Sequence, residues 1–226
     1  MNKLESILHG LSATAIPILD AAISINSYTA LDLSITNAAL DAYNITNPTS
    51  CQEYIDSVLK KNHAEVAYGG YLEKRNLYSD KSNFSSNTMA LRNIHLGIDY
   101  WAKAGTSVLA PIKGKVHSFQ NNSAMGDYGP TIILHHQFND SSFYTLYGHL
   151  SLDSIKNVYV GKEFERGETL GFLGTPDINV NYAPHLHFQI INDIGAYHGD
   201  YPGVCTENDL AFYKSNCPDP NLLLGL

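Results

Sequence analysis

The sequence has few charged residues and no excess of positive ones. Charged side chains make up 16% of its 226 residues, and 14 Lys and Arg stand against 22 Asp and Glu, a formal net charge of −8. General nucleic-acid binding requires a basic surface, so this balance excludes it. It also argues against electrostatic attraction to anionic lipids or wall polymers. We therefore expect partners to be recognised by shape and local chemistry.

Long apolar runs are also missing. No stretch reaches the roughly 18 apolar residues of a membrane-spanning helix, so the sequence predicts no membrane span. The first 25 residues have an apolar tendency, but Glu5, His9 and Asp20 interrupt it and no clear small-residue cleavage site follows. We expect a mature chain or a cytoplasmic product, with the cell envelope or periplasm as the alternative location.

Cysteine is scarce. The three cysteines, Cys51, Cys205 and Cys217, lack the Cys-x-x-Cys spacing of a structural zinc site. An odd number suits free thiols in a reducing compartment, although Cys205 and Cys217 are close enough in sequence to pair. We expect all three thiols to be reduced.

The composition that remains favours a β-rich protein with a buried core. Apolar residues make up 44% of the chain, and 15 tyrosines and 17 glycines favour strands and turns. From about residue 92, short apolar stretches alternate with turn signals, as in an antiparallel architecture. The expected strands are Ser107–Pro111, Lys115–Phe119, Thr131–Phe138, Phe143–Leu150, Asp153–Val160, Glu168–Leu173 and Leu186–Asn192.

Residues 1–65 have a different pattern. Leu31–Tyr43 and Cys51–Lys61 carry apolar residues at helical spacing, with Thr49 or Ser50 as a candidate N-cap. We predict a helical N-terminal extension over 1–65, with a propeptide or inhibitory segment as the alternative. Residues 66–226 form the main domain, with an irregular tail from His198. The predicted fold class is mainly β, in antiparallel sheets, and α+β overall.

Two short strings carry the chemistry. In His95-Leu-Gly-Ile-Asp99 and His185-Leu-His187, the polar residues are spaced so that each string, as a strand, presents them on one face. Three imidazoles and a carboxylate directed at one point make a candidate transition-metal site. Nitrogen and oxygen ligands suit zinc, and three protein ligands leave one tetrahedral position open for water, as in catalytic sites.

These strings belong to a longer series of motifs. His95-x-x-x-Asp99, Gly105–Pro111, Gly114-Lys-Val116, Tyr147-Gly-His-Leu150 and His185-Leu-His187 follow in order over about residues 92–192. This series resembles the lysostaphin-type (LytM-like, β-lytic) zinc metallopeptidases, many of which are peptidoglycan endopeptidases. The resemblance implies antiparallel sheets with a groove over the metal. It places the zinc ligands at His95, Asp99 and His187, and the two catalytic histidines at His149 and His185.

A narrower resemblance extends beyond this core. Gly69–Arg75, Asp127–Pro130, Tyr201–Cys205 and Cys217–Gly225 are similar to the metallopeptidase-type domain found fused to class III aminotransferases. The present chain carries no aminotransferase sequence.

The resemblance implies a zinc-dependent metalloendopeptidase that cleaves peptidoglycan cross-links or related short peptides through a zinc-activated water. Peptides or peptidoglycan fragments are then the expected partners, and the oligomeric state stays open. The alternatives are a non-catalytic binding or regulatory module of the same fold, and a zinc hydrolase of small cytosolic amides. All five site positions hold suitable side chains, which favours the enzyme.

Overall fold

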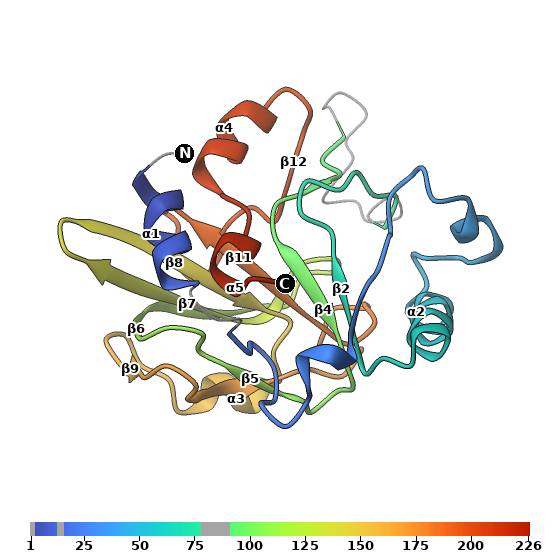
Figure 1. Ribbon diagram of the computed structural model, residues 1–226, viewed down its shortest axis with the longest axis horizontal. Coiled ribbons are helices and arrows are strands. Elements are labelled where there is room, and N and C mark those ends of the chain that lie inside the picture. The colour runs from blue at the N-terminus through green and yellow to red at the C-terminus, as the bar shows by residue number, and fades with distance from the viewer. Residues whose placement is uncertain (1–2, 13–15, 78–90) are drawn as a thin grey trace.

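The fold is organised around one curved eight-stranded sheet (Figure 1). The computed structural model describes residues 3–12, 16–77 and 91–226. The strand order is β1-β2-β4-β11-β8-β7-β6-β9, and every pair is antiparallel except β1 with β2. The strands are β1 (Tyr28–Ala30), β2 (Val66–Gly69), β4 (Ile98–Trp101), β6 (Gly114–Asn122), β7 (Gly129–Phe138), β8 (Ser141–Gly148), β9 (Glu163–Phe164) and β11 (His185–Ile191). This confirms the predicted fold class.

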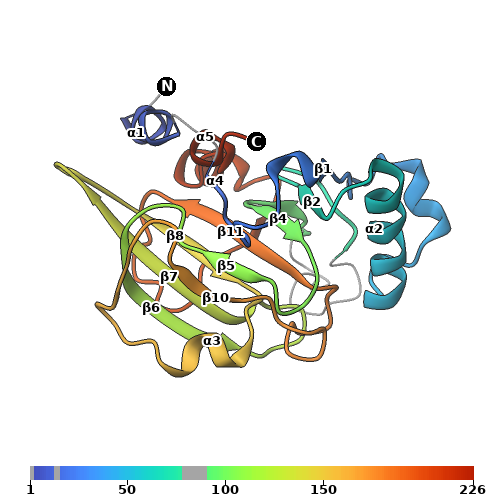
Figure 2. The ribbon, with the colours of Figure 1, turned by 60° about the horizontal axis from the view of Figure 1, so that its bottom comes forward.

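Two smaller sheets and several helices complete the structure. The small sheets pair β5 (Ser107–Leu109) with β10 (Thr169–Phe172), and β3 (Ile94–His95) with β12 (Val204–Cys205). Figure 2 shows α1 (Lys3–Leu11) beside α5 (Asn221–Leu224), although they lie at opposite ends of the chain. The remaining helices are α2 (Pro48–Asn62), α3 (Leu152–Lys156) and α4 (Leu210–Asn216), with 3-10 turns η1 (Ile25–Ser27) and η2 (Ala38–Ala42). In the described part of the chain, no helix is long and apolar enough to span a bilayer.

The central strands separate an apolar core from a polar face. Alternation along β11 sends Leu186, Phe188 and Ile190 into the main core, where side chains of α1 and α5 also pack. His185, His187 and Gln189 consequently lie on the opposite face of the same strand. The polar side chains of β11 thus lie on a central strand of the sheet, paired on both sides.

The N-terminal region differs from its prediction in two details. The helix expected at Cys51–Lys61 is α2, but Asn47 caps it, since its side chain accepts hydrogen bonds from the backbone N–H groups of Thr49 and Ser50. Within Leu31–Tyr43 only η2 is helical, so the longer helix predicted there was wrong. The side chain of Asp32 accepts from the Ser34 N–H, and local bonds of this kind compete with helix formation.

Two predictions in the second half of the chain also need correction. The strand expected at Asp153–Val160 is instead α3, where the Ser154 hydroxyl accepts from the Phe172 N–H and so anchors a helical turn to β10. The tail is not irregular, because it contains β12, α4 and α5. Pro220 is the N-cap of α5, and its φ of −59° is compatible with the helical backbone that follows.

The cysteines agree with the sequence prediction. Cys51, Cys205 and Cys217 are all buried free thiols. Burial is the main cause that raises the thiol pKa of Cys51 and Cys205 to about 11, so these thiols stay protonated at neutral pH.

Candidate metal centre

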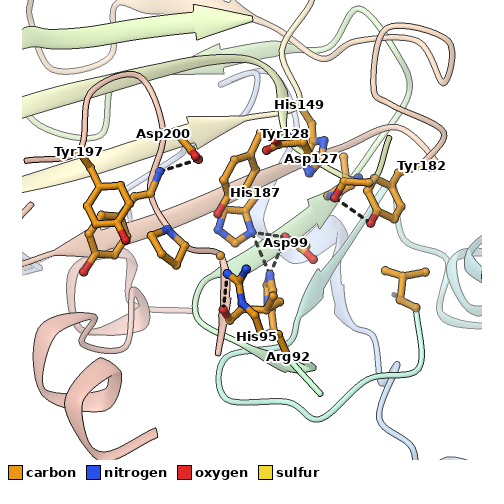
Figure 3. A pocket seen from close by; sticks show the side chains of 17 residues that line it. Arg92, His95, Asp99, Asp127, Tyr128, His149, Tyr182, His187, Tyr197 and Asp200 are labelled. Carbon is orange, nitrogen blue, oxygen red and sulfur yellow. Dashed lines mark hydrogen bonds and ion pairs between the residues drawn. The ribbon is translucent and has the colours of Figure 1, made fainter. Parts of the chain in front are cut away.

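Strand register brings two of the predicted ligands together. In the antiparallel pair of β11 and β4, His187 lies directly opposite Asp99. Directly paired residues point to the same face of a sheet, so both side chains enter the same space. His95, at the end of β3, reaches this space from the neighbouring small sheet (Figure 3). All three side chains are at least 97% buried.

Three acceptor atoms converge at this point. The Nε2 atom of His95 lies 2.9 Å from the Nδ1 atom of His187, and these nitrogens lie 3.2 and 3.1 Å, respectively, from the Oδ1 atom of Asp99. Ligands about 2.0–2.1 Å from a tetrahedral zinc ion are separated from one another by about 3.3 Å. The triangle therefore has the size that a zinc ion requires.

Each ligand histidine has one ring nitrogen hydrogen-bonded on the side away from the cluster, and this bond determines which nitrogen is free to bind a metal. The Nδ1–H of His95 donates to the Gly70 carbonyl at 2.9 Å, and the Nε2–H of His187 donates to the Oε1 atom of Gln189 at 2.9 Å. The Gln189 amide has this orientation because its NH₂ group donates to the Pro202 carbonyl. The Nε2 atom of His95 and the Nδ1 atom of His187 are therefore the nitrogens that carry the lone pairs. These lone pairs face the Asp99 carboxylate at close range, and a cation bound between the three atoms would stabilise them.

Asp99 is held in the same way by a buried arginine. Its Oδ2 atom accepts a hydrogen bond from Nη1 of Arg75 at 2.6 Å, and Arg75 also pairs with Glu73. Burial by itself would raise the Asp99 pKa, but the neighbouring His95 and Arg75 outweigh it and hold this pKa well below its usual range. Asp99 is thus an ionised carboxylate with Oδ1 turned toward the two histidines.

Burial also keeps the His95 imidazole neutral. The pKa of His95 falls to about 4, first because of burial and then because of the positive charge of Arg75. Neutral imidazole is the form that binds a metal ion. His95 and Asp99 are therefore in the protonation states that metal binding requires, and the three predicted ligands lie close together, which fits zinc.

The two predicted catalytic histidines lie beside this cluster. Their ring centroids are 4.1 Å apart. His185 begins β11 and donates its Nδ1–H to the Ala183 carbonyl at 2.7 Å, so its Nε2 atom carries the lone pair. Its ring stacks on Trp101, at a centroid distance of 5.7 Å.

His149 occupies a less common backbone position. Directly after β8 it adopts the left-handed region, with φ of 63°, and backbone bonds with Tyr128 and Gly174 hold it there. Among the described residues, its buried Nδ1 atom has no hydrogen-bond partner. Burial first, and then the neighbouring His185, lower the His149 pKa well below its usual range. The ring is therefore neutral and available to a ligand.

All five side chains line one cavity of about 280 Å³. Four tyrosines, two aspartates and an arginine extend it beyond the cluster, namely Tyr128, Tyr182, Tyr197, Tyr201, Asp127, Asp200 and Arg92 (Figure 3). Among the described residues that line it, none belongs to residues 1–65. Within the described part of that segment, β1 pairs with β2 at the sheet edge and side chains of α1 pack into the main core.

Sequence reasoning missed the groups that hold the ligands. Gln189 shares the polar face of its strand with His185 and His187, and that alternation could have identified it. Arg75 and Gly70 lie 20 or more residues before His95 or Asp99, and no local periodicity connects them. Only the folded chain shows that they contact the cluster.

Part of the chain is similar to known peptidases. Residues 93–198 match peptidase family M23. The chain is 34% identical over 96 residues to the DD-carboxypeptidase/endopeptidase Mpg of Neisseria meningitidis, and 30% identical over 95 residues to an uncharacterised metalloprotease of Haemophilus influenzae. These matches cover 42% of the present chain but only 20% and 18% of the relatives, respectively.

Solved structures show a similar range. The catalytic domain of the antimicrobial peptidase lysostaphin from Staphylococcus simulans is 28% identical, with a TM-score of 0.39, and the match covers 54% of the present chain and 80% of that domain. A mutant catalytic domain of the prophage-encoded M23 protein EnpA from Enterococcus faecalis is 23% identical, with a TM-score of 0.37, and the match covers 53% of the present chain and 87% of that domain. Residues 93–198, the part of the chain that matches peptidase family M23, contain His95, Asp99 and His187.

Proposed function

We propose that this protein is a zinc-dependent metallopeptidase that hydrolyses peptide amide bonds. One observation carries the proposal. One acceptor atom from each of His95, Asp99 and His187 points to a common place, because the other polar atom of each side chain is already hydrogen-bonded elsewhere. The neutral imidazoles of His149 and His185 line the same cavity. Such a layout has the open side of a catalytic metal site.

We assign metal binding to three of the five residues and the chemistry of the substrate to the other two. His95, Asp99 and His187 would hold the zinc ion, which would supply a water of lowered pKa and a positive charge to polarise the substrate carbonyl. His185 accepts the proton of the attacking water, because its Nδ1–H is already engaged and its Nε2 lone pair is free. His149, 4.1 Å from His185 between ring centroids, stabilises the charge that develops on the substrate oxygen.

For the substrate we propose peptidoglycan cross-links or related short peptides. The Neisseria relative is named a DD-carboxypeptidase/endopeptidase, and the tyrosine-lined cavity suits a peptide. The resemblance to the domain fused to class III aminotransferases stays a prediction. A non-catalytic module and a hydrolase of small amides stay the alternatives.

Zinc content and turnover in two variants test this function. We expect His187→Ala to lose bound zinc, whereas His185→Ala keeps zinc and loses hydrolysis of muropeptides. His136→Gln is the matched control, because His136 is a buried β-strand histidine that bonds to Lys113 and Thr145, on a strand that contributes no candidate ligand. It should keep both zinc and turnover.

The outcomes separate the alternatives. Equal loss of zinc in His187→Ala and His185→Ala would refute the division of roles. Zinc-bound protein that cleaves small amides but no muropeptide would favour the small-amide hydrolase. Zinc-bound protein that cleaves neither would indicate the non-catalytic module.

A further inference from the structure

A segment outside the family match contacts two of the three candidate ligands. Residues 69–75 precede the M23 region, yet Gly70 binds His95 and Arg75 binds Asp99. We propose that Arg75, held by Glu73, is a positioning residue that orients Asp99 toward the metal ion. The inference rests on the proposed zinc site, and it makes residues 69–75 part of that site.

Backbone pairing places this segment beside β3. The Leu72 N–H donates to the His95 carbonyl, the His95 N–H to the Glu73 carbonyl, and the Arg75 N–H to the Asn93 carbonyl, at 2.8–3.0 Å. These bonds run on both sides of the ligand His95. The position of Arg75 is therefore coupled to the strand end that carries a ligand.

A glycine makes room for the arginine. Gly70 has a φ of +104°, and a Cβ atom there would lie 1.8 Å from Nη2 of Arg75. Only glycine combines this backbone conformation with so close an approach. The guanidinium also lies 5.5 Å from the centroid of Trp101, the residue on which His185 stacks. Arg75 thus contacts both the candidate ligand Asp99 and Trp101, on which the predicted catalytic residue His185 stacks.

The hydrogen bond selects one oxygen of Asp99. Because Arg75 engages Oδ2 at 2.6 Å, Oδ1 is the oxygen that faces His95 and His187. A carboxylate without this bond can rotate, and the apo site then loses its preset geometry. Contacts behind a metal ligand contribute roughly 10- to 100-fold to metal affinity.

Charge alone predicts the opposite effect. A fully buried guanidinium close to the site repels a divalent cation, so its removal should strengthen zinc binding if orientation is unimportant. Glu73 moderates this repulsion because its carboxylate pairs with Arg75, while its Oε1 atom accepts from the Leu33 N–H at 3.1 Å. The sign of the change in zinc affinity therefore distinguishes positioning from mere proximity.

The experiment measures zinc affinity by competition with a chromophoric chelator, together with the melting temperature of the metal-free protein. We expect Arg75→Met to bind zinc roughly 10- to 100-fold more weakly. Arg75→Lys keeps the charge but lacks the forked geometry, and should lie between Arg75→Met and the wild type. Glu73→Gln, which leaves Arg75 in place but less firmly held, should lose a smaller factor.

His136→Gln is the control for general destabilisation, with a lower melting temperature and unchanged zinc affinity. Equal or tighter zinc binding by Arg75→Met, with normal binding by the wild type, would overturn the inference and leave the proposed function intact. If Arg75→Met does not fold, Arg75→Lys decides because it keeps the positive charge, and unchanged affinity there overturns the inference. A wild-type protein that binds no zinc would overturn both.

Discussion

Each candidate ligand has one heteroatom engaged away from the cavity and one left facing it. His95 is held by a backbone carbonyl, His187 by a side-chain amide and Asp99 by a guanidinium. These three partners differ in chemistry, but each leaves the same result, a lone pair directed at the common point. At the scale of residues, these hydrogen bonds thus determine the tautomer of each histidine and the Asp99 oxygen that faces the cavity.

Gly97 is required by close packing against a ligand. A Cβ atom at this position would lie 2.5 Å from the Phe188 carbonyl oxygen and 2.8 Å from Cε1 of His187. We expect Gly97→Ala to displace the His187 ring and to weaken zinc binding by at least about tenfold, measured by chelator competition. Gly10→Ala is the control, because nothing lies within 4 Å of its added methyl group. Equal zinc affinity in both variants would contradict this account.

Asp127 predicts a pH dependence of stability. Burial, and then the nearby Asp200, raise the pKa of the Asp127 carboxyl from 3.8 to about 6. Because the folded pKa is above the unfolded one, its stabilising contribution is present below about pH 4 and is lost as the pH rises through 6. Asp127→Asn should therefore gain stability relative to the wild type between pH 4 and pH 7.

Urea unfolding of both proteins at the two pH values measures this difference. The amide keeps an oxygen that can accept from the Tyr128 N–H, as Asp127 does, so the local turn is retained. Arg92 lowers the Asp127 pKa and opposes the effect without cancelling it. A constant stability difference across this range would show that Asp127 titrates normally.

At the scale of elements, register decides whether the site exists. β11 lies between β4 and β8, with His187 opposite Asp99 on one side and Gly148 on the other. A shift by one residue would turn His187 to the apolar face, where Leu186 and Phe188 now pack. The core therefore stabilises the register, and the register brings the ligands together.

The N-terminal helix α2 provides a test of capping. Asn47 accepts hydrogen bonds from two N–H groups of the first turn, so Asn47→Ala should lower the free energy of unfolding by about 1 kcal/mol. Urea denaturation measures the change. Thr49→Ala, at the exposed residue that sequence spacing predicted as a cap, should have a smaller effect. The reverse order would restore the original prediction.

At the scale of the whole molecule, a ligand that binds only the folded state stabilises it. Zinc at about 100 times its dissociation constant contributes about 2.7 kcal/mol. For a chain of this length, this corresponds to a rise of about 5–10 °C in the melting temperature. We expect a chelator to remove this increment from the wild type in a thermal scan. His187→Ala should melt at the same temperature with zinc or chelator, and a shift there would indicate zinc binding elsewhere.

The whole molecule also joins its N-terminal region to the site. β1 extends the sheet beside β2, and the Leu33 N–H reaches Glu73, which holds Arg75. The described N-terminal residues therefore form part of the fold that supports the metal centre. The division at residue 65 stays a prediction of sequence pattern.

Local patterns in the sequence were enough for the predicted strands of β7, β8 and β11, whereas the full set of five candidate site residues came from the resemblance of the motif series to a known family. Alternation depends on neighbours two residues apart, and the motif series marks the site in order along the chain. The same reasoning failed at Asp153–Val160 and in the tail, where a hydrogen bond from Phe172 and the placement of prolines decide the local structure.

Only the tertiary structure determined how the ligands are held. Gln189, Gly70 and Arg75 act on the site through contacts between β11, β3, β4 and the segment after β2. Such contacts depend on strand register and burial, which no short window of sequence contains. The sequence by itself determined which side chains are candidate zinc ligands, whereas the packing of distant segments decided which of their atoms face a common point.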